Sequence, residues 1–206
     1  MTSKRVLGAF SAVVAFFLIA PTAIVVPMSV TTTSSFNFPP KGFTLRWYQN
    51  LFTDDAWLSA LFNSFKVAML VVVVATLIGT ACAVGIYRTG GKISQLAQAI
   101  FLTPMVVPGV VLAIGLYSVF LRMGLLGSLM GFVMAHSVLA VPLVLINVLA
   151  SLQGYDQKLE LAAASLGANR STIFRTVTMP LIMAGIVAGA LFAFITSFDE
   201  VVLSVF

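Results

Sequence analysis

The chain has 206 residues, of which 60% are hydrophobic and only 8% are charged. A water-soluble domain of this length could not cover so much apolar side chain with polar surface, so the composition indicates an integral membrane protein. The net charge is +5, but the lysines and arginines are scattered between apolar runs, which argues against a nucleic-acid-binding face. The single cysteine, Cys82, excludes a disulfide within the chain and a thiolate metal site.

Five apolar runs are long enough to cross a lipid bilayer, which takes about 20 helical residues at about 1.5 Å each. Unpaired backbone groups cost several kcal/mol each in lipid, so these runs are expected to be helices. We therefore predict an all-α integral membrane protein, a multi-span helical bundle forming one transmembrane domain over residues 1–206. The predicted spans are residues 6–28, 58–87, 97–121, 129–150 and 180–206.

The positions of lysine and arginine predict the orientation, because short cytoplasmic loops retain positive charge. A cytoplasmic N-terminus places Lys4, Arg5, Arg88, Lys92, Lys158, Arg170 and Arg175 inside, and Lys41, Arg46 and Arg122 outside. We therefore expect an external, partly ordered loop over residues 29–57 and a cytoplasmic loop over residues 151–179. Lys66 falls near the outer end of the second span, where its side chain can reach the interface.

Nothing in the sequence favours an enzyme. The single histidine, His136, has no plausible metal partners, and no Ser/His/Asp or Cys/His arrangement is present. Gly90-Gly91-Lys92 lacks the spacing of a phosphate-binding loop. We predict no catalytic residue and no metal site, which leaves transport, scaffolding or signalling.

One polar stretch, "LAAASLGANRSTIFRTVTMPLI", lies between the last two apolar runs. Residues 160–166 favour a helix, and Gly167 provides a position where the backbone can break. A second helical piece is expected to begin near Ser171, as a cap, and to end before Pro180. Two short helices joined at a glycine on the inner face of a bundle form a surface suited to a partner protein.

The spacing of Ala162-Ala163, Leu166-Gly167 and Met179-Pro180 resembles the EAA loop of the membrane-spanning subunits of bacterial ABC importers. In that family the loop is a coupling helix that docks into a groove of the cytoplasmic ATPase. Other segments look like the polyamine-type permeases, specifically the second permease subunit of spermidine/putrescine importers. These segments are "FPPKGFTLRWYQNLF", "NSFKVA", "PMVVPGVVLAIGLY", "AHSVLAVPLVLINV" and "SFDEVVLSVF".

The resemblance implies the type I ABC importer permease fold in a bacterial inner membrane, and import of polyamines or a similar small solute into the cytoplasm. It implies three partners, namely cytoplasmic ABC ATPase subunits, a second homologous permease subunit, and a periplasmic or external solute-binding protein. ATP and Mg²⁺ would be bound by the ATPase, and no cofactor by this chain. Relatives continue into a sixth span, which we expect to be missing here because the chain stops at Phe206.

The resemblance also assigns residues to coupling with the ATPase. The family's usual Glu-Ala-Ala is Leu161-Ala162-Ala163 here, with Glu160 one position earlier. Arg170 and Arg175 can be explained as inner-face residues retained by the charge rule, and the resemblance gives Arg170 a second meaning as a coupling contact, which we favour. The residues assigned to the coupling loop are Glu160, Ala162, Ala163, Leu166, Gly167, Arg170 and Pro180.

Five residues are candidates for a substrate path. Asp199 and Glu200 in the last run could attract a cationic substrate, or could cap the helix or bind the companion subunit. His136 could contact substrate, or could be a structural histidine bonded within the bundle. Pro104 and Pro108 should break or bend the third span, either to line a path or for packing alone.

Glycines in the apolar runs most simply allow close contacts between helices. Those expected to do so are Gly79, Gly85, Gly115, Gly127 and Gly131.

Two other functions remain open at this point. An ion-coupled secondary transporter would use Asp199 and Glu200 as ion or proton sites, and a non-transporting membrane scaffold would use neither. Within importers, the cargo could instead be an aminophosphonate or an opine.

Overall fold

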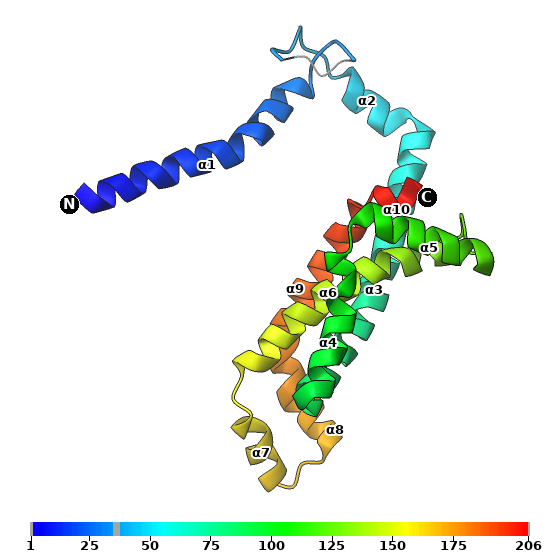
Figure 1. The fold of residues 1–206 in the computed structure, drawn as a ribbon. Coiled ribbons are helices and arrows are strands. Elements are labelled where there is room, and N and C mark those ends of the chain that lie inside the picture. Colours follow the sequence, from blue (N-terminus) through cyan, green and yellow to red (C-terminus); the bar gives the residue numbers. More distant parts are fainter. Residues whose placement is uncertain (1, 35–37, 206) are drawn as a thin grey trace. The chain divides into compact units, whose positions relative to one another are not determined.

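The computed structural model describes residues 2–34 and 38–205, and in those ranges the chain forms helices joined by turns (Figure 1). The predicted all-α class is therefore confirmed. The chain divides into two compact units, a first unit of residues 1–61 and a second unit of residues 62–206. The helices are α1 (Thr2–Met28), α2 (Arg46–Thr53), α3 (Asp55–Thr89), α4 (Gly91–Val106), α5 (Gly109–Met123), α6 (Leu129–Gly154), α7 (Lys158–Ser165), α8 (Arg170–Ile173), the π-helical turn η1 (Phe174–Thr178), α9 (Met179–Phe198) and α10 (Val202–Val205).

Several helices in the described part of the chain are long and apolar enough to cross a membrane. Four stretches qualify by themselves, namely Lys4–Met28, Asp55–Thr89, Leu129–Gly154 and Arg170–Phe198. The pair α4 and α5 adds a fifth if it counts as one broken span. This number agrees with the predicted multi-span bundle.

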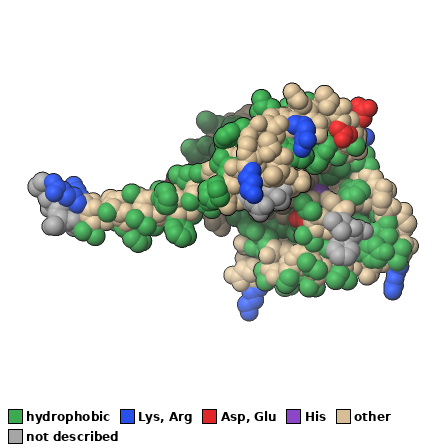
Figure 2. All heavy atoms as spheres, turned by 90° about the horizontal axis from the view of Figure 1, so that it is seen from above, with side chains coloured by type: hydrophobic (Ala, Val, Ile, Leu, Met, Phe, Trp, Pro, Cys, Tyr) green, Lys and Arg blue, Asp and Glu red, His purple; other side chains and the backbone are tan. Residues whose placement is uncertain are grey.

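In the first unit, α1 exposes its apolar side chains along its whole length, as Figure 2 shows for the arm at the left. Such a helix is suited to lipid rather than to water. The segment predicted as a loop over residues 29–57 contains α2, and residues 35–37 of it lie outside the described residues. Trp47 Nε1 donates to the Thr31 carbonyl at 2.7 Å, and the Tyr48 hydroxyl donates to Ser29 Oγ at 2.7 Å. These bonds tie α2 to the chain that follows α1.

In the second unit, α6 is the central helix. It is apolar around its circumference, and Val144 and Leu145 are fully buried. Val71 and Ala75 of α3 and Ile182 of α9 complete the core around it. A helix without a polar face is suited to the middle of a bundle, where other helices surround it.

Glycines allow α3 and α9 to approach α6 closely. A Cβ atom at Gly79 would lie 2.7 Å from Val144 Cβ, and one at Gly189 would lie 2.8 Å from Val144 Cα. A Cβ atom at Gly185 would collide with Ser151 Oγ and the Asn147 carbonyl oxygen. Small residues that let backbones approach are the main device of helix packing in membranes.

The sequence prediction for these glycines is right in part. Gly79 meets another helix, as predicted, whereas Gly131 meets the backbone of Leu125 just before its own helix. The prediction is wrong within this chain for Gly85, Gly115 and Gly127, because a side chain there would meet open space.

The third predicted span, residues 97–121, is not one straight helix. α4 ends at Val106 and α5 begins at Gly109, with an angle of 104° between them. Val107 and Pro108 have extended backbone, because the proline ring disfavours helical geometry in the residue before it. Pro108 therefore produces the break, while Pro104 is accommodated inside α4.

The last predicted span, residues 180–206, also differs from the structure. α9 ends at Phe198, and α10 forms a separate turn over residues 202–205. His136 Nδ1 donates to the carbonyl oxygen of Ser197 at 3.2 Å. That carbonyl would accept from residue 201 in a continuing helix, so the histidine occupies an acceptor that a longer α9 would use itself.

We predict that Gly185→Ala lowers the thermal unfolding midpoint of the detergent-solubilised protein. Overpacking of a tight contact typically costs about 1–3 kcal/mol, because the backbones of α6 and α9 must move apart. Gly85→Ala is the matched control, since nothing lies within 4 Å of the new Cβ and alanine favours helix. Equal midpoints for the two variants would contradict the close approach at Gly185.

Candidate functional site

Residues 155–178, between α6 and α9, form the loop segment. The end of the second unit that contains the loop segment is the loop end. Its first helix, α7, ends in a glycine cap. Gly167 has a φ of +85°, and its N–H donates to the Ala164 carbonyl while the Ala168 N–H donates to the Ala163 carbonyl. This is the Schellman arrangement, in which the left-handed residue is normally glycine. Gly167 is therefore needed for the backbone turn rather than for a close contact, since the space beside it is open.

The second part of the loop segment is continuous with the last span. The Thr172 N–H donates to Asn169 Oδ1 at 2.9 Å, so the cap is Asn169 and not the predicted Ser171. The helix does not end before Pro180, as predicted, but runs from Arg170 to Phe198. It passes the proline through η1, where the Met179 N–H donates to the Phe174 carbonyl. In a π-helical turn the backbone N–H donates to the carbonyl five residues earlier instead of four. This shift compensates for the backbone N–H that Pro180 lacks.

Most residues assigned to coupling lie on an exposed surface of the loop segment. Leu166 is 89% exposed and Leu161 is 67% exposed, although both are apolar. Ala162, Gly167 and Arg170 are exposed as well, Ala163 is half-buried, and Pro180 lies in the first turn of α9. The name apolar strip is used below for Leu161, Ala162 and Leu166. Leucines so exposed at a helix end are suited to contact with another protein.

Glu160 differs from its neighbours because its side chain points into the protein. Its Oε1 accepts from the Tyr155 hydroxyl and from Thr178 Oγ1, each at 2.5 Å. Arg88 Nη2, at the end of α3, lies 3.7 Å from the same oxygen. The sequence alone did not indicate these three partners. Arg88 and Thr178 are distant from Glu160 along the chain, and Tyr155 follows a different helix.

The electrostatics of this cluster keep Glu160 ionised. Burial alone would raise its pKa, but the hydrogen bonds from Thr178 and Tyr155 and the charge of Arg88 together lower it. Burial, together with the bond to Glu160, raises the pKa of Tyr155 to about 12. The phenol therefore keeps its proton and can donate it to the carboxylate.

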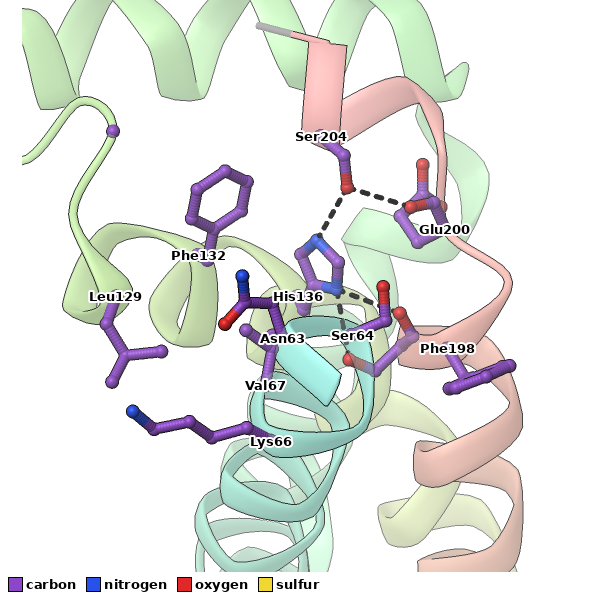
Figure 3. Close-up of a pocket in the computed structure, with 12 residues that line it drawn as sticks. Asn63, Ser64, Lys66, Val67, Leu129, Phe132, His136, Phe198, Glu200 and Ser204 are labelled. Carbon is purple, nitrogen blue, oxygen red and sulfur yellow. Dashed lines mark hydrogen bonds between the residues drawn. The ribbon is translucent and has the colours of Figure 1, made fainter. Parts of the chain in front are cut away.

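The opposite end of the second unit, called the far end, holds a cavity of about 440 Å³ (Figure 3). This far-end pocket is formed where α3 begins, where α6 begins and where α9 ends. His136 and Glu200 both line it, whereas Asp199 is exposed outside it. The lining residues are Asn63, Ser64, Lys66, Val67, Gly127, Leu129, Phe132, His136, Ser197, Phe198, Glu200 and Ser204.

His136 is buried and joins α6 to the end of α9. Its Nδ1 lies 3.0 Å from Ser197 Oγ as well as 3.2 Å from the Ser197 carbonyl, and its Nε2 lies 3.5 Å from Ser204 Oγ. The imidazole thus has protein partners on both nitrogens, which supports the structural interpretation of this residue. Glu200 accepts from the Leu203 N–H at 3.1 Å, so one of its oxygens caps α10.

Three polar residues of α3 contribute to the far-end pocket and were not predicted. Asn63, Ser64 and Lys66 lie on one wall, and Figure 3 shows Lys66 on the other side of His136 from Glu200. The available signal was their spacing within an otherwise apolar run, since polar residues in spans usually face a cavity or the bundle interior.

The structure does not bring the two prolines to the far-end pocket. Pro104 lines a separate, apolar cavity of about 310 Å³ together with Ser137 of α6. Pro108 is exposed at the break between α4 and α5. Of the five predicted path residues, only His136 and Glu200 therefore share a site.

Comparisons with known proteins match most of the chain. The family model described as "binding-protein-dependent transport system inner membrane component" matches residues 75–206. The spermidine/putrescine transport system permease protein PotC of Escherichia coli K12 is 31% identical over 206 residues, covering 100% of this chain and 78% of that protein. PotC of Haemophilus influenzae is 30% identical over 197 residues, covering 93% of this chain and 77% of that protein.

A relative named for putrescine transport is similar at a comparable level. The putrescine transport system permease protein PotI of Escherichia coli K12 is 29% identical over 205 residues, covering 94% of this chain and 73% of that protein. With the helical fold and the family match, these similarities identify the class of protein. The chain belongs to the family of inner-membrane components of binding-protein-dependent transport systems.

Proposed function

We propose that this chain is one membrane-spanning subunit of an ATP-driven importer whose cargo is a polyamine such as spermidine or putrescine. The observation that carries the mechanism is the loop segment, because it presents exposed leucines and continues without interruption into the last span. The cargo is inferred from relatives named as spermidine/putrescine and putrescine permeases.

The distribution of charge supports a cytoplasmic loop segment. Arg88 and Lys92 lie where α3 meets α4, and Lys158, Arg170 and Arg175 lie in the loop segment itself. Positive charge is retained on the cytoplasmic side of membrane proteins. We infer that the N-terminus is cytoplasmic too and that the protein resides in the inner membrane.

The proposal includes three partners. A cytoplasmic ATPase docks on the apolar strip, where Leu161 and Leu166 would become buried. A solute-binding protein delivers cargo at the far end, and a second permease subunit completes the path. ATP and Mg²⁺ are bound by the ATPase, and this chain supplies no residue to hydrolysis.

The continuous helix from Arg170 to Phe198 connects the two ends. When the ATPases close on ATP, they displace the loop segment, and the same helix shifts the wall of the far-end pocket at Ser197 and Phe198. The spans then alternate between outward and inward access to a site that both states share.

The far-end pocket has features that suit an ammonium group. Its volume of about 440 Å³ falls within the range of small-molecule sites, about 300–1,000 Å³. Glu200 supplies a carboxylate, and Phe132 adds an aromatic ring to the lining. One oxygen of the Glu200 carboxylate accepts from the Leu203 backbone N–H, and the carboxylate can accept further hydrogen bonds from a ligand.

One observation favours a second class of cargo. Lys66 lines the same pocket as Glu200, on the other side of His136 (Figure 3). Opposite charges on two walls would complement a zwitterion such as an aminophosphonate or an opine, whereas Lys66 would repel a second ammonium group. The effect of removing the Lys66 charge therefore distinguishes the two classes.

The first prediction concerns the ATPase. In a Cys82→Ala background, Leu166→Cys should cross-link to a nucleotide-hydrolysing protein in native membranes, because the leucine is 89% exposed on the apolar strip. Met123→Cys, 58% exposed near the far end, is the matched control and should capture none. Absence of an ATPase from the Leu166→Cys product, in membranes competent for uptake, would overturn the proposed coupling.

A second prediction separates the two carboxylates of the last run. Glu200→Gln should raise the KM for spermidine uptake about tenfold, a loss of about 1.4 kcal/mol, because the ammonium loses its counter-charge while the cap on α10 is kept. Asp199→Asn is the control and should leave KM within about twofold, since Asp199 lies outside the pocket. The opposite order of effects would exclude Glu200 from the substrate path.

The third prediction tests the class of cargo. If the substrate is a polyamine, Lys66→Gln should lower its KM several-fold, because a like charge is removed from the pocket. If the substrate is a zwitterion, the same change should raise KM, since the acidic group of the solute loses its partner. Uptake of radiolabelled spermidine and of an opine in the same cells measures both, with Lys92→Gln as the control for loss of a lysine outside the pocket.

A further inference from the structure

The cluster around Glu160 joins three separate elements of the second unit. Tyr155 directly follows α6, Thr178 is the last residue of η1, and Arg88 is near the end of α3. All three contact the same carboxylate oxygen of α7, two through hydrogen bonds of 2.5 Å and one at 3.7 Å. Charge-assisted bonds of this kind are stronger than neutral ones.

Neighbouring contacts strengthen the same junction. Gln157 Nε2, just before α7, donates to the Tyr87 hydroxyl of α3 at 2.8 Å. The rings of Tyr87 and Tyr155 lie 6.3 Å apart, and the Arg88 guanidinium lies 5.9 Å from the centre of the Phe174 ring of η1. The beginning of the loop segment and its π-helical turn are thus both tied to the end of α3.

Burial separates this cluster from the surface proposed for docking. Thr178 is fully buried, and the Glu160 side chain is only 26% exposed. Leu166, by contrast, is 89% exposed. If the Glu160 side chain turned outward to meet another protein, its Oε1 would lose two hydrogen bonds and the contact with Arg88.

The position of Thr178 gives the cluster a mechanical consequence. η1 is the last part of the loop segment and leads directly into α9, and π-helical turns are points where helices bend. The bond from Thr178 to Glu160 fixes the end of this turn to α7. Without it, the two halves of the loop segment are joined through the turn at Gly167 and the local contacts of α7 with α8 and η1.

We propose that Glu160 is a positioning residue: with Tyr155, Thr178 and Arg88 it clamps α7 to η1, so that displacement of the apolar strip moves α9 instead of bending the helix at the π-helical turn. Glu160 then acts within the chain and is not a docking contact for the ATPase. This inference rests on the proposed function of the loop segment, and its geometric part can be tested without the ATPase.

The functional test uses the complete importer, reconstituted with its ATPase and solute-binding protein. Thr178→Val and Glu160→Ala should each reduce spermidine uptake at least fivefold while the ATPase still co-purifies in the wild-type ratio. Glu160→Gln, which keeps an acceptor for Tyr155 and Thr178, should recover much of the uptake. Thr176→Val is the matched control, because the Thr176 hydroxyl donates to the Thr172 carbonyl of its own helix, and it should transport like the wild type.

Loss of ATPase co-purification in Glu160→Ala, with normal uptake in Thr178→Val, would show that Glu160 is a docking contact and would overturn the clamp. If even the wild-type chain retains no ATPase, the proposed function fails instead. A second measurement, made without the ATPase, then tests whether Glu160 clamps α7 to η1.

That measurement is the distance between spin labels at Leu161 and Arg175, two exposed positions on either side of the cluster. The wild-type chain and Thr176→Val should give one narrow distribution, and Thr178→Val a distribution at least twice as broad. Equal widths in all three would overturn the clamp.

Discussion

The backbones of α6 and α9 approach so closely at Gly185 and Gly189 that neither position has room for a methyl group. In lipid, where apolar surface gains little from contact with other apolar surface, such close packing is a main source of attraction between helices. The contact holds the two helices together near Ser151 at the loop end and near Val144 in the middle. At the far end, His136 continues the junction through Ser197. The pair therefore connects the loop segment physically to the far-end pocket.

Polar chemistry is concentrated at the two ends of this pair. At the loop end, the Glu160 carboxylate is bonded within the chain, and apolar leucines are left exposed. At the far end, Lys66 and Glu200 line a cavity large enough for a small solute. A subunit that receives force at one end and contacts cargo at the other needs this division, because a polar group in the apolar middle would cost free energy without a partner. The family match and the relatives named as permeases agree with such a subunit.

The sequence predicted those features that depend on local composition. Apolar length indicated the spans, and the alanines before Gly167 indicated a helix ended by a glycine. It did not distinguish Pro108, which breaks the third span, from Pro104, which α4 accommodates, because the difference lies in how neighbouring residues can adjust. The uninterrupted passage through Pro180 depends on η1, whose shifted bonding has no clear sequence signal. The Glu160 cluster and the far-end pocket join residues of different helices, and spacing along the chain does not reveal such contacts.

The most direct test of the central claim is whether the helix from the loop segment to the far end stays straight while the importer works. Labels at Arg170 and Ile195, both exposed, should lie about 37 Å apart along a continuous helix of 25 steps. Electron spin resonance on the assembled importer should give that one distance both without nucleotide and with trapped ATP. A distance that shortens or splits on ATP binding would show that the helix bends at η1, and would contradict transmission of the ATPase movement through α9.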